Sequence, residues 1–441
     1  MKPPNLRPIQ PGSIVLVSGP SGSGKTTLLP ALIDQTQRPS CIADPAPDED
    51  LPLIDELPLP SEAAAAALTA CGLTDPVTWS QTPDELSEGQ RARWALCKAI
   101  YIADGWIVAD DWLCTLDQPT AQAVAWTAGR AMRAANRGAI LCTPRDDLSP
   151  FLFPDIHVRV GWSEEPVITH PPAVPPRCPL LEGAEVERGS LADYRPFAPM
   201  HYAAGPPRSP RSVWLIWIPS HPQPVGCAVL TYPDLRNPAR DLVTDGVYRS
   251  AHGRQVARRL NQEVARIARI VILPEYRGIG LARCLLDHIA DHEGVKWLEI
   301  STAMAHYTNF LDACGFVEAP RPAHDVEAHL LDWADRHQID PAVAFDPTAL
   351  VAELDRMSIR ERRLGRRLVW QYYHKHVLHR RTKAPMPKNV PNESDDRWIA
   401  AFEFVARRLY ERPRYLIRGP LTPDQEPPEC PNSTTAETMP S

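Results

Sequence analysis

Short apolar runs alternate with helical segments over the first third of the chain. Residues 13–18 form a continuous apolar run typical of a buried strand, and a helical segment over 28–33 follows a Gly/Ser-rich turn. Apolar positions recur with helical spacing over 92–100, and 105–109 and 139–143 predict further buried strands. Strands that alternate with helices indicate an α/β domain.

A second group of strands and helices occupies the middle of the chain. Residues 212–217, 224–230 and 265–273 have the composition of sheet strands. A Gly-containing turn, a helix over 283–292 and a strand over 297–301 follow. The order strand, turn, helix therefore occurs twice along the chain.

Proline clusters divide the chain. The sequence has 441 residues, too many for one compact core, and 49 of them are proline. Prolines gather at 171–176, at 320–322 and from 420 onward, where no helix can continue. We therefore predict an N-terminal domain over 1–170, a linker over 171–186, a middle domain over 187–320, a C-terminal helical, partly basic region over 321–418 and a disordered tail over 419–441.

Composition excludes several classes of protein. The chain lacks the roughly 18 uncharged apolar residues that a membrane span needs, and its start lacks a signal-peptide core. Its 10 cysteines are scattered without a Cys-x-x-Cys pair, which indicates reduced thiols and no zinc site. We expect a cytoplasmic protein that does not contact a membrane.

The turn after the first strand carries candidate phosphate-binding residues. Glycine backbone N–H groups can surround phosphates, and the following helix directs its positive end at the same charge. Lys25 is expected to reach the β- and γ-phosphates, while Thr26 and Asp110, at the carboxyl end of a strand, are expected to ligate Mg²⁺. The predicted ATP-binding residues of this turn are Gly19, Gly22, Gly24, Lys25, Thr26 and Thr27.

Three further motifs follow in order. Ser87, Gly89 and Gln90 lie at a helix start, where N–H groups can meet a phosphate, and Leu116-Asp117 follows the strand that ends before Asp110. The ordered set resembles the ABC ATPase superfamily, with Walker A, signature, Walker B and D-loop motifs. That resemblance implies an ATP-binding domain that forms a head-to-tail homodimer around nucleotide.

The chain departs from that family at the residues of hydrolysis. Asp111 stands where the family has a catalytic Glu, and Pro144 stands where it has a switch His, with Thr143 or Arg145 as conceivable substitutes. The interval from Lys25 to the signature is too short for a transporter's helical subdomain, which disfavours a transporter ATPase. We identify no Q-loop glutamine and no adenine-stacking aromatic. Asp111 is the candidate catalytic residue, and whether ATP is hydrolysed or only bound stays open.

The second turn has glycines suited to close approach of an anion. Arg277, Gly278, Gly280 and Ala282 precede the helix over 283–292. The pattern Arg-x-x-Gly-x-Ala resembles the acyl-CoA pyrophosphate motif of GNAT acyltransferases. The resemblance covers roughly residues 187–320 and implies that these four residues bind acetyl-CoA or another acyl-CoA.

The acid and base of acyl transfer are less defined in the sequence. Leu311 stands where many GNAT members have a donor Tyr, so Tyr307, one helical turn earlier, becomes the candidate, with His306 beside it. Glu275 and the pair His201-Tyr202 are candidate bases. Each of these side chains can equally be structural.

The fused arrangement resembles a small family of ABC ATPases joined to predicted acetyltransferases, through residues 71–76, 116–121 and 304–315. The GNAT half has a weaker resemblance to Mom-type phage DNA-modification acyltransferases. From Glu353 to Lys388 the chain carries eleven Lys/Arg and three Asp/Glu, interleaved with Trp370, Tyr372 and Tyr373. Residues 356–388 can therefore bind nucleic acid, or can form an amphipathic helix packed on the GNAT domain.

The expected fold class is α/β multidomain: a P-loop (ABC-type) ATPase domain, a GNAT α+β acyltransferase domain and a C-terminal helical region. One hypothesis is a nucleotide-gated N-acyltransferase that acts on a macromolecule, with nucleic acid favoured. The alternative is an ATP- and CoA-binding switch with little or no catalysis. Neither the acyl acceptor nor the particular acyl-CoA is specified by the sequence.

Overall fold

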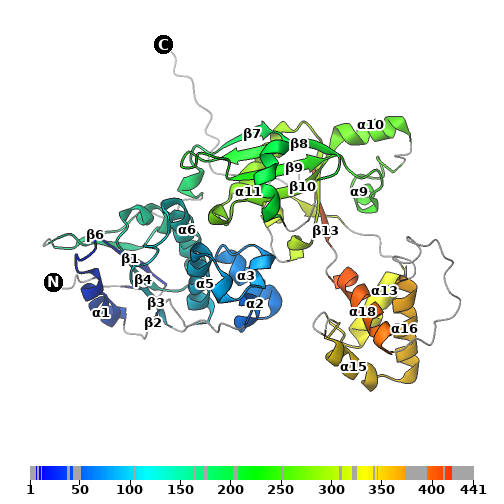
Figure 1. The fold of residues 1–441 in the computed structure, drawn as a ribbon, viewed down its shortest axis with the longest axis horizontal. Coiled ribbons are helices and arrows are strands. Elements are labelled where there is room, and N and C mark those ends of the chain that lie inside the picture. The colour runs from blue at the N-terminus through cyan, green and yellow to red at the C-terminus, as the bar shows by residue number, and fades with distance from the viewer. Residues whose placement is uncertain are drawn as a thin grey trace, which may run out of the picture.

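The structure of the protein is a computed structural model. It describes residues 6, 9–10, 12–36, 40–42, 51–102, 105–162, 165–171, 177–201, 207–249, 253–306, 310–319, 325–340, 343–344, 346–373, 395–410 and 413–419. Figure 1 shows three groups of elements, namely a sheet with helices from the N-terminal part, a second sheet, and a cluster of helices near the C-terminus.

The first sheet has six strands in the order β2-β3-β4-β1-β5-β6. All neighbours are parallel except β5 and β6, and every residue of β1, β3 and β4 is buried, as expected for a sheet covered on both faces. The strands are β1 (Ile14–Ser18), β2 (Ser40–Ile42), β3 (Trp106–Ala109), β4 (Ala139–Thr143), β5 (Ile156–Arg159) and β6 (Val167–Thr169).

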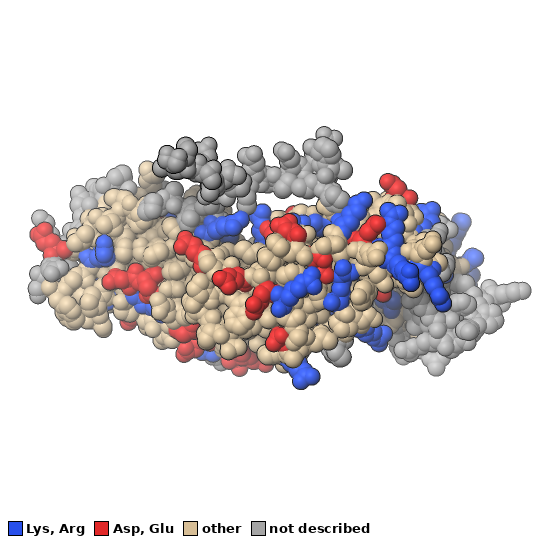
Figure 2. Space-filling view, turned by 90° about the horizontal axis from the view of Figure 1, so that it is seen from above, with Lys and Arg blue, Asp and Glu red and all other residues tan. Residues whose placement is uncertain are grey.

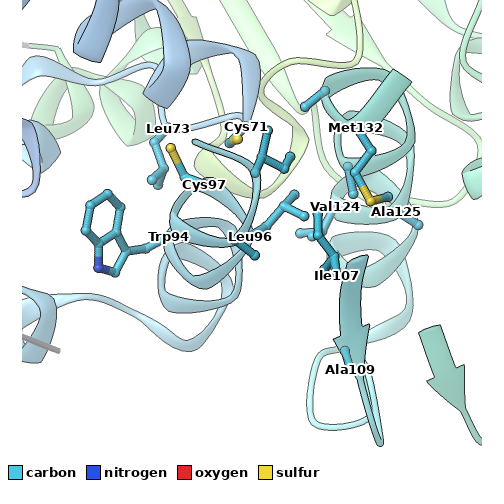
Figure 3. Close-up of a cluster of buried hydrophobic side chains, with 14 of the residues drawn as sticks. Cys71, Leu73, Trp94, Leu96, Cys97, Ile107, Ala109, Val124, Ala125 and Met132 are labelled. Atoms are coloured by element: carbon cyan, nitrogen blue, oxygen red, sulfur yellow. The ribbon is translucent and has the colours of Figure 1, made fainter. Parts of the chain in front are cut away.

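Helices follow these strands in the order that the apolar pattern predicts. The helices of this part are α1 (Lys25–Thr36), α2 (Leu53–Glu56), α3 (Ser61–Ala70), α4 (Pro76–Trp79), α5 (Glu88–Tyr101), α6 (Gln118–Ala134) and α7 (Ser149–Leu152), with short 3-10 turns η1 (Pro83–Glu85) and η2 (Asp146–Leu148). Figure 3 shows how α5 and α6 share one apolar cluster with β3, through side chains such as Leu96, Ile107 and Val124. Helix α5 is thereby fixed to the strand that precedes Asp110.

The second sheet has seven strands in the order β12-β13-β11-β10-β9-β8-β7. Only β10 and β11 are parallel, and the other neighbouring pairs are antiparallel. The strands are β7 (Glu185–Gly189), β8 (Pro210–Trp217), β9 (Gly226–Thr231), β10 (Val264–Ile272), β11 (Trp297–Thr302), β12 (Val317–Glu318) and β13 (Arg414–Arg418). β13 therefore inserts between β11 and β12 after a long excursion of the chain.

Short helices surround this sheet, and one long helix packs across it. These elements are η3 (Pro179–Leu181), α8 (Leu191–Tyr194), η4 (Arg195–Met200), α9 (Pro238–Val243), α10 (Arg254–Glu263), η5 (Pro274–Tyr276), α11 (Leu281–His292), η6 (Ala303–His306) and α12 (Phe310–Ala313). Leu285, Leu286 and Ile289 of α11 pack against β8, β9 and β10. The same cluster includes Ala123 and Trp126 of α6, so the two sheets are joined through a shared apolar core.

The third group has its own apolar cluster, made by α13 (Asp325–Arg336), α15 (Pro347–Arg356), α16 (Ile359–Tyr373) and α18 (Asp395–Tyr410). Only helices were predicted over 321–418, so β13 departs from that prediction. A buried ion pair between Arg240 and Glu299, to which the Tyr415 hydroxyl also donates, fixes β13 in the second sheet. An isolated five-residue strand gains its partners only through such long-range contacts.

None of the helices that the structure describes is both long enough and apolar enough to cross a membrane.

Candidate functional site

The first phosphate-binding loop connects β1 to the N-terminus of α1. Gly19, Gly22 and Gly24 have φ values of +153°, +79° and +97°, which side chains rarely tolerate. A Cβ on Gly19 would lie 2.0 Å from the Val160 carbonyl oxygen, so the turn requires glycine there. Ser21, Gly22, Thr26 and Thr27 are exposed, so an anion can approach the start of the helix.

Two buried polar groups in this loop fit a phosphate ligand. The Lys25 ammonium is 5% exposed and donates to the carbonyls of Gly19 at 2.7 Å and Pro20 at 3.0 Å. Ser23 is 6% exposed, and its Oγ has no hydrogen-bond partner among the described residues. A buried hydroxyl without a partner is costly, and a phosphate oxygen would supply the missing bond.

The two predicted magnesium ligands lie together. Thr26 Oγ1 donates to Asp110 Oδ2 at 2.7 Å, which links the start of α1 to the end of β3. Asp111 follows with φ of +47°, and its backbone N–H donates to Asp110 Oδ1 at 3.0 Å. Mg²⁺ commonly takes one or two protein oxygens and completes its shell with phosphates and waters, so this pair fits the ion. Elsewhere in the described chain, no group of three or more His, Cys, Asp or Glu could hold a metal.

The residues considered as replacements for the switch His are otherwise engaged. Thr143 is fully buried in β4. The Arg145 guanidinium donates to both carboxylate oxygens of Asp147 at 3.1 Å and to the Leu116 carbonyl at 2.7 Å. Arg145 therefore ties the turn at Leu116 to Asp147.

Two features near this loop were not foreseen. Trp162 is 61% exposed, and its ring lies 3.2 Å from the Cβ position of Gly22. A large exposed aromatic beside a phosphate loop is suited to stacking on a base. The signal in the sequence was a Trp shortly after the strand that ends at Arg159, but only the parallel pairing of β5 with β1 brings it to the loop.

A buried polar cluster supports the loop from behind. Ser18 Oγ, at the end of β1, donates to Asp146 and lies 2.8 Å from His157 Nε2. Burial lowers the pKa of His157, and the Arg159 charge acts in the same direction. The cluster joins three chain segments directly before Gly19.

The predicted signature residues form the N-terminus of α5. Ser87 is the N-cap residue, and it exchanges hydrogen bonds with Gln90 in a capping box, at 2.9 and 3.3 Å. Gln90 also donates to the Thr78 hydroxyl at 3.2 Å. Ser87 is exposed and Gly89 is half-buried. The helix N-terminus therefore faces solvent, where a phosphate from a second molecule can reach it.

The second loop predicted to bind phosphate connects β10 through η5 to α11. Gly278 and Gly280 have φ values of +85° and +104°, and Gly280 is the N-cap residue of α11. Both glycines are exposed, whereas Ala282 is half-buried in the first turn of α11. The backbone of this loop is open to a ligand at the positive end of a twelve-residue helix.

β10 and β11 diverge beside this loop. They pair only from Val264 with Trp297 to Ile267 with Ile300. β10 then continues to Ile272 along β9 alone, after a β-bulge between Ile267 and Arg269. The divergence opens the sheet next to the loop, and the bulge leaves Ala268 outside the ladder with β9.

The acid and base candidates are only partly described. Tyr307 and Tyr202 lie outside the described residues. His306 is exposed, and His201 and the Glu275 side chain are half-buried. Leu311 is 1% exposed and belongs to the apolar core of the second sheet.

The second loop makes contacts with the first domain that sequence analysis missed. Arg93 of α5 donates from Nη2 to the Glu275 carbonyl at 2.9 Å, and Arg277 forms an ion pair with Asp75 at 3.2 Å. A Cβ on Gly278 would lie 2.7 Å from Cγ2 of Thr127 in α6. Burial lowers the pKa of Arg93 to about 10, and the Arg277 charge acts in the same direction. The only signal in the sequence was the segment over 71–76, which carries part of the resemblance to the fused family but predicts no contact with the second loop.

The basic C-terminal stretch is described up to Tyr373. Tyr372 is buried, while Trp370 stacks on Tyr373 and Tyr373 contacts Phe404 of α18. Tyr372 and Tyr373 belong to the apolar cluster of the C-terminal helices and not to the core of the second sheet. Arg360, Arg363 and Arg367 are exposed along one face of α16, and Arg356 is exposed at the end of α15. Residues 374–388 lie outside the described part of the chain.

No protein-family model and no curated protein sequence matches this chain. Among solved structures, the dimeric ATP-binding cassette MJ0796 in a post-hydrolysis state with ADP and Pi is 15% identical, with a TM-score of 0.28 over 37% of this chain and 88% of the cassette. MJ0796 described as a bacterial ABC transporter cassette is 16% identical, with a TM-score of 0.29 and the same coverage. Likeness at this level assigns neither fold nor function, so the assignments below depend on the geometry of the two loops.

Proposed function

We propose that residues 1–170 form an ABC-type ATP-binding domain. The support is a single arrangement: a buried Lys25 and an unpartnered Ser23 hydroxyl inside the loop, with Thr26 and Asp110 paired at 2.7 Å beside it. A triphosphate with Mg²⁺ would bring negative charge to Lys25 and acceptor oxygens to the Ser23 hydroxyl, and its metal ion would bind Thr26 and Asp110. ATP with Mg²⁺ is therefore the proposed ligand.

The exposed start of α5 supports a homodimer through this domain. Ser87 and Gly89 face solvent, so a phosphate from the nucleotide of a second copy can dock on the helix N-terminus. Two such contacts related by a two-fold axis would close the pair. Hydrolysis is proposed to be slow, because Asp111 is the only candidate base and Arg145 is held by Asp147.

We further propose that residues 187–320, completed by β13, form a GNAT-type acyltransferase domain that binds acetyl-CoA or another acyl-CoA. The support is the order β8, β9, β10, glycine turn, α11, β11, which is the order that the resemblance implies, together with the divergence of β10 from β11. Backbone N–H groups of 277–280 would hold the pyrophosphate, and the gap would admit the thioester.

The reaction is transfer of the acyl group to an amine. The amine nitrogen attacks the thioester carbonyl carbon, the C–N bond forms and the C–S bond breaks. The amine loses a proton to a base, for which Glu275 is the candidate, and the CoA thiolate gains one from an acid, for which Tyr307 is the candidate. A thioester is reactive enough for an amine to attack it without activation by a metal ion, so the second loop need not supply metal ligands.

The proposed acceptor is a macromolecule, with nucleic acid favoured. Its support is the row of exposed arginines Arg356, Arg360, Arg363 and Arg367 on the helical cluster. Figure 2 also shows Lys and Arg side chains gathered toward the end of the molecule that carries α10. Phosphate contacts of this kind bind without reading sequence.

The test is binding and turnover with matched variants. Isothermal titration of the purified protein should detect ATP–Mg²⁺ and acetyl-CoA separately. Gly280→Val, at φ of +104°, should abolish acetyl-CoA binding and leave ATP binding intact. Gly294→Val has a similar φ of +74° in open space and serves as the control. If wild type binds ATP and not acetyl-CoA, the acyltransferase assignment fails.

A second candidate function is a switch that binds both ligands with little or no catalysis. Asp111, Pro144 and the buried Leu311 favour it, because each stands where the resembled families use a reactive side chain. Release of CoA thiol in the presence of polyamine, protein and nucleic-acid acceptors distinguishes the two functions. Ligand binding without thiol release from any acceptor would favour the switch.

A further inference from the structure

The Arg93 guanidinium joins α5, a helix of the first domain, to the loop over 275–280. It lies on α5, two turns after the exposed Ser87 end, and its Nη2 donates to the Glu275 carbonyl at 2.9 Å. Glu275 belongs to η5, directly before the glycines of the second loop. One rigid helix therefore connects the proposed partner-nucleotide site to the proposed acyl-CoA loop.

The environment of Arg93 is unusual for a charge. The side chain is 2% exposed, and its Nε has no hydrogen-bond partner among the described residues. A buried cation that is only partly satisfied is costly, and such a group is sensitive to small displacements of its neighbours. The hydrogen bond from Arg93 to the Glu275 carbonyl therefore restricts where η5 can lie.

A second ion pair fixes the same loop from the other side. Arg277 Nη1 lies 3.2 Å from Asp75 Oδ2, and Arg277 Nε donates to the Ile272 carbonyl at 3.1 Å. Asp75 is also the N-cap of α4, through a bond from the Val77 N–H at 3.0 Å. The Arg277 side chain is thereby directed at the ATP-binding domain, while its backbone borders the exposed glycines.

Close backbone contact completes the junction. A Cβ on Gly72 would lie 2.9 Å from Arg93 Nε, and one on Gly278 would lie 2.7 Å from Thr127 Cγ2 and 3.5 Å from the Gly72 Cα. Both glycines have φ of +85°. Displacement of α5 or of the turn at Gly72 therefore cannot occur without displacement of the 275–278 loop, since no space separates them.

We propose that Arg93 is a positioning residue that couples the two sites, so that ATP-dependent pairing of two copies at the start of α5 tightens acyl-CoA binding at the 275–280 loop. This coupling depends on the proposed function for its ligands. By linkage, acyl-CoA tightens ATP-dependent pairing by the same factor. Asp75 assists by holding Arg277.

The test measures acetyl-CoA affinity of the full chain with and without a non-hydrolysable ATP analogue and Mg²⁺. In wild type the analogue should tighten acetyl-CoA binding by about tenfold, within the usual range for coupled sites. Arg93→Met should reduce that factor to about one. This variant should fold, because replacing a buried charge by an apolar side chain of similar size is commonly tolerated.

Matched variants separate coupling from general damage. Arg137→Met removes a guanidinium that donates to the Ala99 carbonyl at the other end of α5, at 3.2 Å, and should keep the full factor. Asp75→Asn retains the helix cap of α4 and removes only the ionic partner of Arg277, so it should lower the factor partway.

A second readout needs no acyl-CoA. The ATP analogue should slow amide hydrogen exchange in peptides that cover 272–282 in wild type and not in Arg93→Met. If acetyl-CoA binds but the analogue alters neither its affinity nor this exchange, the coupling is overturned and the acyltransferase proposal stands. If acetyl-CoA does not bind while the exchange still responds through Arg93, the acyltransferase proposal fails and the coupling stands. A wild-type response in Arg93→Met would refute the role of Arg93.

Discussion

The two phosphate loops share a backbone plan and differ in where their cations lie. In the first loop Lys25 is buried inside the turn and donates to the loop's own carbonyls at 2.7 and 3.0 Å, with Thr26 and Asp110 paired alongside. In the second loop Arg277 pairs instead with Asp75 of the other domain. The second loop therefore offers an anion only backbone N–H groups and a helix N-terminus.

Because of this difference, only the second loop depends on contacts from another domain for its shape. The first loop has a buried lysine and the proposed magnesium ligands within its own domain, so the proposed ATP site needs no contact from the second domain. The second loop is held by Arg93, Asp75 and Thr127 of the first domain, and so its shape depends on that domain. Substitutions at four positions test whether the two loops differ in this way.

The largest effect is expected from Lys25→Met. Loss of a buried cation that contacts phosphates removes charge-assisted hydrogen bonds worth about 3 kcal/mol, or roughly 100-fold in the dissociation constant of ATP. Acetyl-CoA affinity should stay unchanged in the absence of ATP. Isothermal titration measures both, with the exposed Lys296→Met as the control. Equal loss of both ligands would contradict the independence of the first loop.

Gly278→Ala should damage the second loop alone. A Cβ at φ of +85° and 2.7 Å from Thr127 Cγ2 should lower the free energy of unfolding by about 1–2 kcal/mol and weaken acetyl-CoA binding about tenfold, with ATP affinity unchanged. Denaturant unfolding and titration measure these changes.

Two further variants test the cause of that loss. Adding Thr127→Ser removes the methyl and keeps the hydroxyl bonds to the Ala123 and Val124 carbonyls, so part of the stability should return. Gly294→Ala, at φ of +74° with open space, reports the backbone strain alone. A double variant no more stable than Gly278→Ala would show that the contact with Thr127 is not responsible.

Trp162→Ala should weaken ATP binding about fivefold, because stacking on an aromatic ring contributes about 1 kcal/mol. Trp162→Phe should retain most of the affinity. Inorganic tripolyphosphate, which has no base, should bind wild type and Trp162→Ala equally. A similar loss for tripolyphosphate would assign Trp162 to the phosphates instead of the base.

The smallest effect concerns pH. The pKa of His157 is lowered in the folded protein, so the unfolded chain binds more protons as pH falls below about 6.5, and the folded state loses stability there. His157→Gln should therefore show a smaller fall in melting temperature between pH 7 and pH 5.5 than wild type. An unchanged pH profile would mean that other groups dominate this window.

The local sequence was sufficient to predict the strands and helices that flank both loops. The apolar runs predicted β1, β3, β4, β10 and β11, and the helices expected at 28–33, 92–100 and 283–292 lie within α1, α5 and α11. Thr26 and Asp110 could be expected close together, because the carboxyl ends of parallel strands meet at the same edge of a sheet. The individual ligand roles remain predictions.

The pairing of strands that lie far apart in the chain could not be predicted from the sequence. β13 joins β11 and β12 after a helical excursion, through the buried contact of Glu299 with Arg240 and Tyr415. The aromatics of α16 were candidates for base stacking, yet Tyr372 is 3% exposed in a helical core. Periodicity identifies an apolar face but does not identify what covers it.

The sequence by itself determined that this chain has two glycine turns, each between a strand and a helix, and which side chains lie within them. Glycine tolerance of positive φ and the direction of a helix dipole are local properties, so they can be inferred from neighbours in the chain. Only the tertiary structure decided that Arg93 and Asp75 hold the second turn, and that Trp162 borders the first. Those contacts join residues far apart in the chain, and the packing of whole domains selects them.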